Sequence, residues 1–167
     1  MLARLTALAG ALLILAACGS TPDPAAGPGG PGGLGGPGGP GGISSSRFGP
    51  GSQQDLAAAA GDRIFFAFDS AEVSPEAQSI LQRQAEWLRR YPNVTVTIEG
   101  HADERGTREY NLALGERRAQ AARNVLVALG IPASRLATIS YGKERPAVPG
   151  SSEDAYAQNR RAVTVVN

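Results

Sequence analysis

Regular alternation of apolar and polar residues begins only beyond about residue 62 of the 167-residue chain. It is clearest over residues 94–99, where valine and isoleucine alternate with threonine and glutamate. This period of two is typical of a strand with one buried face. Short runs rich in apolar and β-branched residues predict three more strands, at residues 64–68, 137–141 and 162–166.

Helix signals lie between these strands. Ser74, followed by proline and glutamate, is a good N-cap, and the helix that it begins is expected to stop at Tyr91, before a proline. A longer helix is predicted from the N-cap Thr107 to Leu129, which a glycine follows, and a helical turn at 153–159. This order of elements predicts an α/β sandwich with helices packed on a small mixed β-sheet.

The N-terminal end has the features of an export signal. Arg4 precedes an apolar run over residues 8–17, which is too short to span a membrane and is typical of a signal peptide. Cys18 follows directly and is the only cysteine, so no internal disulfide can form. A plain secretory signal with a free cysteine is one interpretation. The small residues before Cys18 favour the other, because they resemble the lipidation signal of bacterial lipoproteins; Gly19 after it then implies an outer-membrane anchor facing the periplasm.

Residues 18–61 show no periodic apolar pattern. Residues 27–42 are almost entirely glycine and proline, which predicts a flexible linker, and the repeat is too short for a collagen triple helix. The expected organisation is therefore a signal peptide at 1–17, a lipidated linker at 18–61 and one domain at 62–167. Removing Arg4 with the signal leaves equal numbers of basic and acidic residues, which argues against a nucleic-acid-binding surface.

Candidate chemistry follows the strand at 94–99. Asp103 lies in the loop after this strand, and three residues of the next helix share one face because they are spaced at i, i+3 and i+7: Asn111, Leu114 and Arg118. A carboxylate and a guanidinium in one pocket suit a zwitterionic ligand. An internal Asp103–Arg118 salt bridge or a solvated helix face are the alternatives that spacing leaves open.

The stretch from residue 100 to 119 resembles the peptidoglycan-binding motif of the OmpA-like family, with Asp103, then Asn111 eight residues later and Arg118 fifteen residues after the aspartate. Two further stretches are similar to the lipid-anchored members of that family, residues 141–146 and 155–163. The resemblance implies an OmpA-like fold and noncovalent binding of the diaminopimelate-containing stem peptide of peptidoglycan. It also implies TolB of the Tol-Pal system as a partner, and a role in holding the outer membrane to the cell wall, including at division.

The resemblance also implies roles for single residues. Asp103 and Arg118 would take the polar ends of diaminopimelate, and Asn111 and Leu114 would shape the pocket. The stretch after the first strand would add a wall and backbone donors through Phe68 and Asp69, and Arg105 would pair with Asp69 or with a ligand carboxylate. On this interpretation Arg118→Ala abolishes binding at little cost in stability. The glycine- and proline-rich linker, and Arg108 where several relatives have proline, depart from the family pattern.

Other functions find less support. A metal site would combine His101, the only histidine, with carboxylates alone, and a hydrolase would need an acid/base pair such as Asp69 and Asp103, for which the sequence shows no spacing. No enzyme activity, cofactor or metal is therefore expected. A lipid-anchored protein-interaction module that uses the arginine-rich helix over residues 117–123 is the main alternative.

Several single residues are interpreted as structural or left undecided: Trp87 as an anchor against the sheet, Tyr141 and Tyr156 as packing, and Arg160 and Arg161 as a solvated edge or part of a partner surface.

Overall fold

The computed structural model describes residues 49–167; the predicted signal peptide, Cys18 and most of the predicted linker lie outside these residues. A four-stranded sheet has the order β1-β4-β2-β3. Its strands are β1 (Arg63–Phe65), β2 (Val96–His101), β3 (Leu136–Gly142) and β4 (Arg161–Val166). β2 and β3 are parallel, whereas β4 is antiparallel to both β1 and β2, which confirms the predicted mixed sheet.

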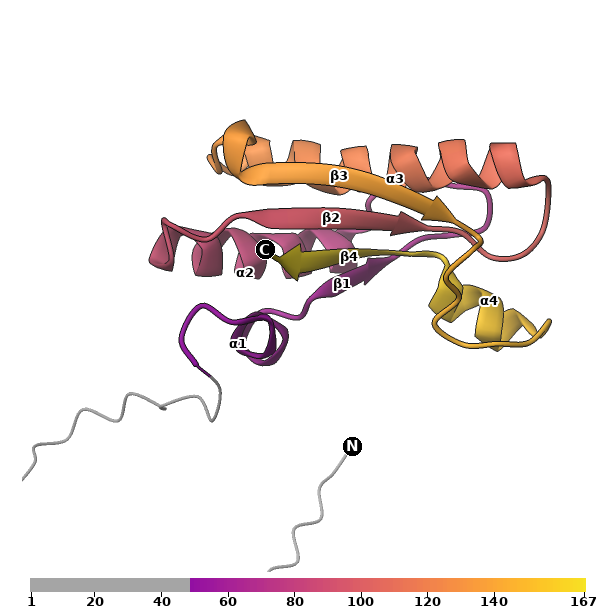
Figure 1. Cartoon of the computed structure of the whole chain (residues 1–167), viewed down its shortest axis with the longest axis horizontal. Helices are drawn as coiled ribbons and strands as arrows, with labels where there is room; N and C mark the ends of the chain where they lie inside the picture. Colours follow the sequence, from indigo (N-terminus) through magenta and orange to yellow (C-terminus); the bar gives the residue numbers. More distant parts are fainter. Residues whose placement is uncertain (1–48) are drawn as a thin grey trace, which may run out of the picture. The chain divides into compact units, whose positions relative to one another are not determined.

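Helices α2 (Pro75–Arg90) and α3 (Arg108–Ala128) lie behind the sheet in the view of Figure 1, on one of its faces. They begin as predicted, because the side chains of Ser74 and Thr107 accept hydrogen bonds from the first turns. The short helix α4 (Glu153–Asn159) and a 3-10 turn (Ala133–Arg135) complete the C-terminal half. Among the described helices, none is both long enough and apolar enough to cross a membrane.

Two glycines bring α3 close to β2. A Cβ at Gly100 would collide with the carbonyl oxygen of Gly115, so only glycine allows this approach of helix and strand. The contact lies beside the end of β2. It therefore brings the N-terminal half of α3, with its predicted pocket residues, next to the loop that carries Asp103.

Helix α1 (Gln53–Ala59) was not predicted, and it lies within the segment that was expected to be linker. Leu56 of α1 is fully buried in the core, and Asp55 accepts a 3.0 Å hydrogen bond from Trp87 Nε1. Trp87 is thus a buried anchor, as expected, but its indole nitrogen bonds to α1. The helix escaped prediction because Leu56 is its only large apolar residue, and one such residue forms no periodic pattern.

Including α1 is expected to stabilise the domain. A fragment that starts at Asp62 loses the buried Leu56 and leaves Trp87 Nε1 without its acceptor, which together should lower the free energy of unfolding by about 3 kcal/mol relative to a fragment that starts at Gly49. Urea unfolding of the two fragments measures the difference. Equal midpoints would show that α1 adds nothing to the core.

Two differences between the observed and the predicted strand ends shape the loops described next. β1 ends at Phe65 rather than at residue 68, because the carbonyl groups that follow bond to arginine side chains of other elements. β2 continues to His101, two residues beyond the predicted end.

Candidate functional site

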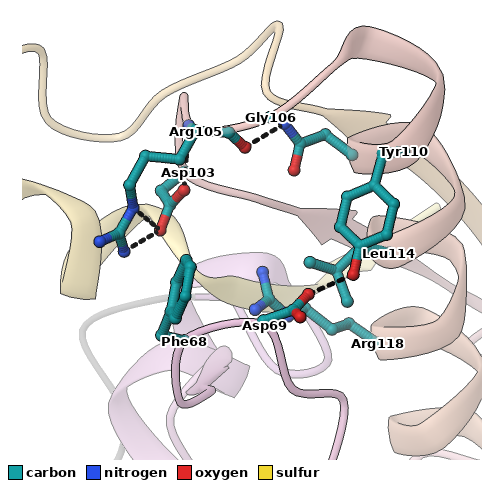
Figure 2. Close-up of a pocket in the computed structure, with 9 residues that line it drawn as sticks. Phe68, Asp69, Asp103, Arg105, Gly106, Tyr110, Leu114 and Arg118 are labelled. Carbon is teal, nitrogen blue, oxygen red and sulfur yellow. Dashed lines mark hydrogen bonds and ion pairs between the residues drawn. The ribbon is translucent and has the colours of Figure 1, made fainter.

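A pocket of about 160 Å³ opens where the loop after β1, the loop after β2 and the first turns of α3 meet (Figure 2). Its lining contains all seven residues proposed from the sequence: Phe68, Asp69, Asp103, Arg105, Asn111, Leu114 and Arg118. Gly106 and Tyr110 also line it and were not proposed. Tyr110 could have been found, because it precedes Leu114 by one helical turn on the same face of α3.

Arg118 is a buried clamp. Its guanidinium donates hydrogen bonds to three backbone carbonyl oxygens: Nε to Ser70 at 2.8 Å, Nη1 to His101 at 2.8 Å and Nη2 to Ala67 at 3.1 Å. The residue has no exposed surface. The expectation of a surface arginine with little structural role is therefore wrong, since this side chain joins the loop after β1 to the end of β2.

The three bonds to carbonyl oxygens do not use all the N–H groups of Arg118. A guanidinium has five N–H groups, so two make no bond within the domain, and Arg118 is one of the residues that line the pocket. Burial lowers the pKa of Arg118 to about 10, an effect that the nearby charge of Asp103 partly opposes. The side chain is therefore cationic at neutral pH and can donate to an anionic group of a ligand.

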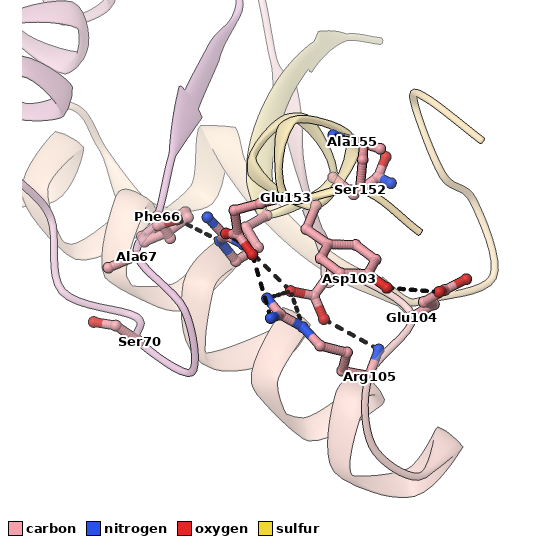
Figure 3. Close-up of polar contacts among 12 residues, drawn as sticks. Phe66, Ala67, Ser70, Asp103, Glu104, Arg105, Ser152, Glu153 and Ala155 are labelled. Carbon is pink, nitrogen blue, oxygen red and sulfur yellow. Dashed lines mark hydrogen bonds and ion pairs between the residues drawn. The ribbon is translucent and has the colours of Figure 1, made fainter. Parts of the chain in front are cut away.

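Asp103 is bonded to two arginines, and neither is Arg118. The carboxylate accepts from Arg105 Nη2 at 2.6 Å, from the Arg105 backbone N–H at 3.1 Å and from Arg160 Nη1 at 3.4 Å (Figure 3). Burial alone would raise the pKa of Asp103, but the hydrogen bonds and charge of Arg105, with the bond from Arg160, hold it below its ordinary value. Asp103 and Arg118 therefore form no salt bridge with each other, and each keeps an opposite charge at the pocket.

Arg105 has partners other than the expected Asp69. Its guanidinium lies between the rings of Phe68 and Tyr156, 4.1 and 4.3 Å from their centroids, and also contacts Glu153 at 3.4 Å. Asp69 instead accepts a hydrogen bond from the Tyr110 hydroxyl, which raises the pKa of Tyr110. The predicted packing role of Tyr156 holds for its ring, and its hydroxyl bonds to Glu104.

The loop after β2 is held from two sides. Asn111 is buried and donates from Nδ2 to the carbonyl oxygen of Arg105 at 2.8 Å. Lys143 donates from Nζ to the carbonyl oxygens of Glu104 and Gly106 at 3.1 and 2.7 Å. The loop that presents Asp103 is thus fixed by side chains from α3 and from the segment after β3.

The loop after β1 offers backbone donors. Asp69 has a positive φ of 51°, which is uncommon for a residue other than glycine. Within residues 49–167, the backbone N–H groups of Phe68 and Asp69 donate no hydrogen bond. A strained turn with free N–H groups at the wall of a pocket is a common arrangement for holding an anion.

Arg160 was left undecided from the sequence and is a buried part of this site. Its Nε donates to the carbonyl oxygen of Phe66 at 3.0 Å, and its Nη1 contacts Glu153 at 2.8 Å as well as Asp103. Arg161 is also buried and donates to the carbonyl oxygen of Arg145. Neither residue is a solvated edge.

His101 does not take part in a metal cluster. No group of three potential ligands occurs in the part of the chain that the structure describes. The imidazole is buried against Tyr141, and neither ring nitrogen has a hydrogen-bond partner there, although Nε2 lies 3.7 Å from Glu99. Burial, with the charges of Arg161 and Arg145, lowers the pKa of His101 to about 4.

Stability is therefore expected to fall as acid is added. Because the folded pKa of His101 lies below its ordinary value of 6.5, the unfolded chain takes up this proton first. Above pH 6.5 the titration of His101 does not change the free energy of unfolding. As the pH falls towards 4 it lowers this free energy progressively, by about 3 kcal/mol in total. Urea unfolding between pH 7 and pH 4 should show this slope, and His101→Asn should flatten it. An unchanged slope in the variant would assign the acid sensitivity to other groups.

The chain is similar in sequence to known proteins. Residues 65–160 match the model of the OmpA family. The peptidoglycan-associated lipoprotein of Agrobacterium fabrum is 62% identical over 117 residues, which cover 70% of this chain and 66% of that protein. The protein of the same name from Haemophilus influenzae is 41% identical over 156 residues, covering 93% of this chain and 92% of that one.

Solved structures agree with the fold. The crystal structure of the peptidoglycan-associated lipoprotein from Burkholderia pseudomallei superposes with a TM-score of 0.62 at 43% identity, over 64% of this chain and 90% of that one. The C-terminal domain of Helicobacter pylori MotB superposes with a TM-score of 0.60 at 22% identity, over 64% and 84% of the two chains, and so shows the fold alone. The chain belongs to the OmpA family and, within it, to the peptidoglycan-associated lipoproteins.

Proposed function

We propose that this domain binds peptidoglycan noncovalently by holding the diaminopimelate residue of its stem peptide. The observation that carries the proposal is that Asp103 and Arg118 line one pocket with opposite charges and form no bond with each other. The side chain of diaminopimelate ends in an ammonium and a carboxylate on one carbon. Two opposite charges on the walls of one small pocket are complementary to such an end group.

Each wall has a role in the proposal. The carboxylate of the ligand receives the two remaining N–H groups of Arg118 and the free backbone N–H groups of the Phe68–Asp69 turn. The ammonium lies against Asp103, and the methylene chain contacts Leu114 and Phe68. Asn111 acts indirectly, because its bond to the Arg105 carbonyl holds the Asp103 loop in place. Arg105 supplies a further cation at the rim.

The cellular role follows from the two ends of the chain. A lipid anchor at Cys18 in the outer membrane, joined by the linker to a wall-binding domain, would tie that membrane to the cell wall from the periplasmic side. This is the proposed contribution to the Tol-Pal system, to envelope integrity and to division. The names of the relatives support the link to peptidoglycan.

TolB is proposed to dock over the rim of the same pocket. Phe68 is 59% exposed and Tyr110 is also exposed, and exposed aromatic side chains are frequent anchors in protein interfaces. Binding of TolB and of the stem peptide would then compete. If the domain bound TolB but no peptidoglycan, it would be a protein-interaction module, the alternative function.

Cosedimentation with isolated cell walls tests the proposed function. The domain should pellet with sacculi and stay in the supernatant once a muramidase has digested them, because noncovalent binding leaves the domain on soluble fragments. A folded domain that stays in the supernatant in both cases would contradict wall binding.

A further inference from the structure

Strand β3 is an unprotected edge of the sheet. It has seven residues, pairs with β2 alone within the described residues, and forms one border of the sheet in Figure 1. Outside this pairing, no hydrogen bond from any other residue of 49–167 reaches the backbone of residues 137–140. Strand edges are usually blunted by proline, by lysine or by a bulge within the strand, because their free N–H and C=O groups can pair with another chain. Residues 137–140 have neither proline nor charge, and the one irregularity in the pairing with β2 lies beyond them, where Tyr141 is skipped between the pairs Gly100–Ser140 and His101–Gly142.

A groove lined by both apolar and charged side chains follows this edge. It lies between β3 and α3, and two adjoining hollows of about 290 and 580 Å³ share Leu112 and Ser140. Leu112 is 49% exposed and Ile139 is 39% exposed, so large apolar side chains border the free edge on both faces of the strand. β1, the opposite edge, has only three residues and offers no comparable length.

We propose that two copies of this chain pair through β3, antiparallel and about a two-fold axis at Ile139, to form one continuous eight-stranded sheet. In this register Ile139 faces its own copy and the small Ala137 faces the large Tyr141. Thr138 faces Ser140, and all these residues are uncharged. Cross-strand pairs of this kind stabilise a sheet.

The proposed two-fold axis also places the α3 helices of the two copies at a normal packing distance. α3 packs on both β2 and β3, with Gln120 bonded to Thr138 and the Leu112 carbonyl to Ser140. With strands about 4.8 Å apart and α3 lying over the space between β2 and β3, the axes of the two α3 helices would lie about 10 Å apart. Packed helices in proteins lie about 8–10 Å apart, so the groove would be filled by the partner's helix.

Charges at the ends of the groove are complementary in this register. Arg123 lies beside Leu136 at one end of β3, and Glu109 lines the groove towards the other end. The antiparallel pairing therefore brings Arg123 of each copy near Glu109 of the other. One contact is unfavourable: Glu116 lies beside Thr138, close to the axis, and would face its own copy. Glu116→Gln should consequently strengthen the pairing.

Cysteine cross-linking of the full chain in its cellular compartment tests the proposal. Paired residues at the axis would have Cα atoms about 4.5–5.5 Å apart, within the range of a disulfide. Ile139→Cys should form a disulfide-linked homodimer at least about ten times more than Val148→Cys, a control of equal exposure (39%) in the loop between β3 and α4. The unsubstituted chain, whose only cysteine is Cys18, measures the background.

Two further variants test the register and the axis. Ala137→Cys and Tyr141→Cys chains should cross-link when expressed together and much less when each is expressed alone. Adding Glu116→Gln to Ile139→Cys should increase the homodimer. The proposal is overturned if Ile139→Cys cross-links no more than Val148→Cys, or if its adducts contain only other proteins, which would make the edge a site for a different partner.

Discussion

Arg118→Ala is expected to unfold the domain far more readily than any exposed arginine substitution, as well as to abolish binding. The alanine removes a fully buried side chain and leaves three carbonyl oxygens without their donor, that of the buried His101 and those of Ala67 and Ser70 in the loop after β1. Each unsatisfied buried group costs about 1–3 kcal/mol, so the free energy of unfolding should fall by about 3–5 kcal/mol. Urea unfolding followed by circular dichroism measures the loss.

Arg83→Ala is the matched control, because Arg83 is an exposed arginine in the middle of α2. Its unfolding midpoint should remain close to that of the unsubstituted domain. If Arg118→Ala unfolded like Arg83→Ala and lost only binding, the guanidinium would be a ligand contact without a structural role, as the sequence alone suggested.

Asp103→Asn is expected to weaken binding about 100-fold and leave the fold in place. The amide has nearly the shape of the carboxylate and can still accept a hydrogen bond from Arg105, so the loop keeps its conformation. It lacks the negative charge that the proposed ammonium needs, and a charge-assisted hydrogen bond contributes about 2–3 kcal/mol, which corresponds to about 100-fold. Titration calorimetry with a diaminopimelate-containing muropeptide measures the change.

Asp154→Asn controls for the loss of one carboxylate, because Asp154 is an exposed residue of α4 outside the pocket. Its affinity should match that of the unsubstituted domain. Equal affinities for the Asp103→Asn and Asp154→Asn domains would contradict the proposed position of the ammonium.

Local signals in the sequence predicted most of the fold. The N-caps at Ser74 and Thr107 and the alternation over residues 94–99 each depend on neighbouring residues, and the structure confirms both helix starts and the strand. Helix α1 has no such periodic pattern, because its stability comes from the contacts of Leu56 and Asp55 with distant elements. Tertiary contacts of this kind leave little trace in a window of neighbouring residues.

The candidate site shows the same division. Helical spacing and the family motif predicted which residues line the pocket. They did not predict the hydrogen-bond partners of those residues. Asp103 bonds to Arg160, which lies 57 residues away in the chain, and Arg118 bonds to the carbonyl of Ser70, 48 residues away. A backbone carbonyl is present at every position, so the sequence contains no mark of which carbonyls an arginine will bind.

The binding claim is tested most directly by calorimetric titration of the domain, residues 49–167, with two muropeptides that differ only at the third position of the stem peptide. One carries diaminopimelate and the other lysine, which lacks the carboxylate proposed to bind Arg118 and the Phe68–Asp69 turn. We expect binding of the diaminopimelate form and at least about tenfold weaker binding of the lysine form. Equal affinity for both, or no binding of either by the folded domain, would contradict the account.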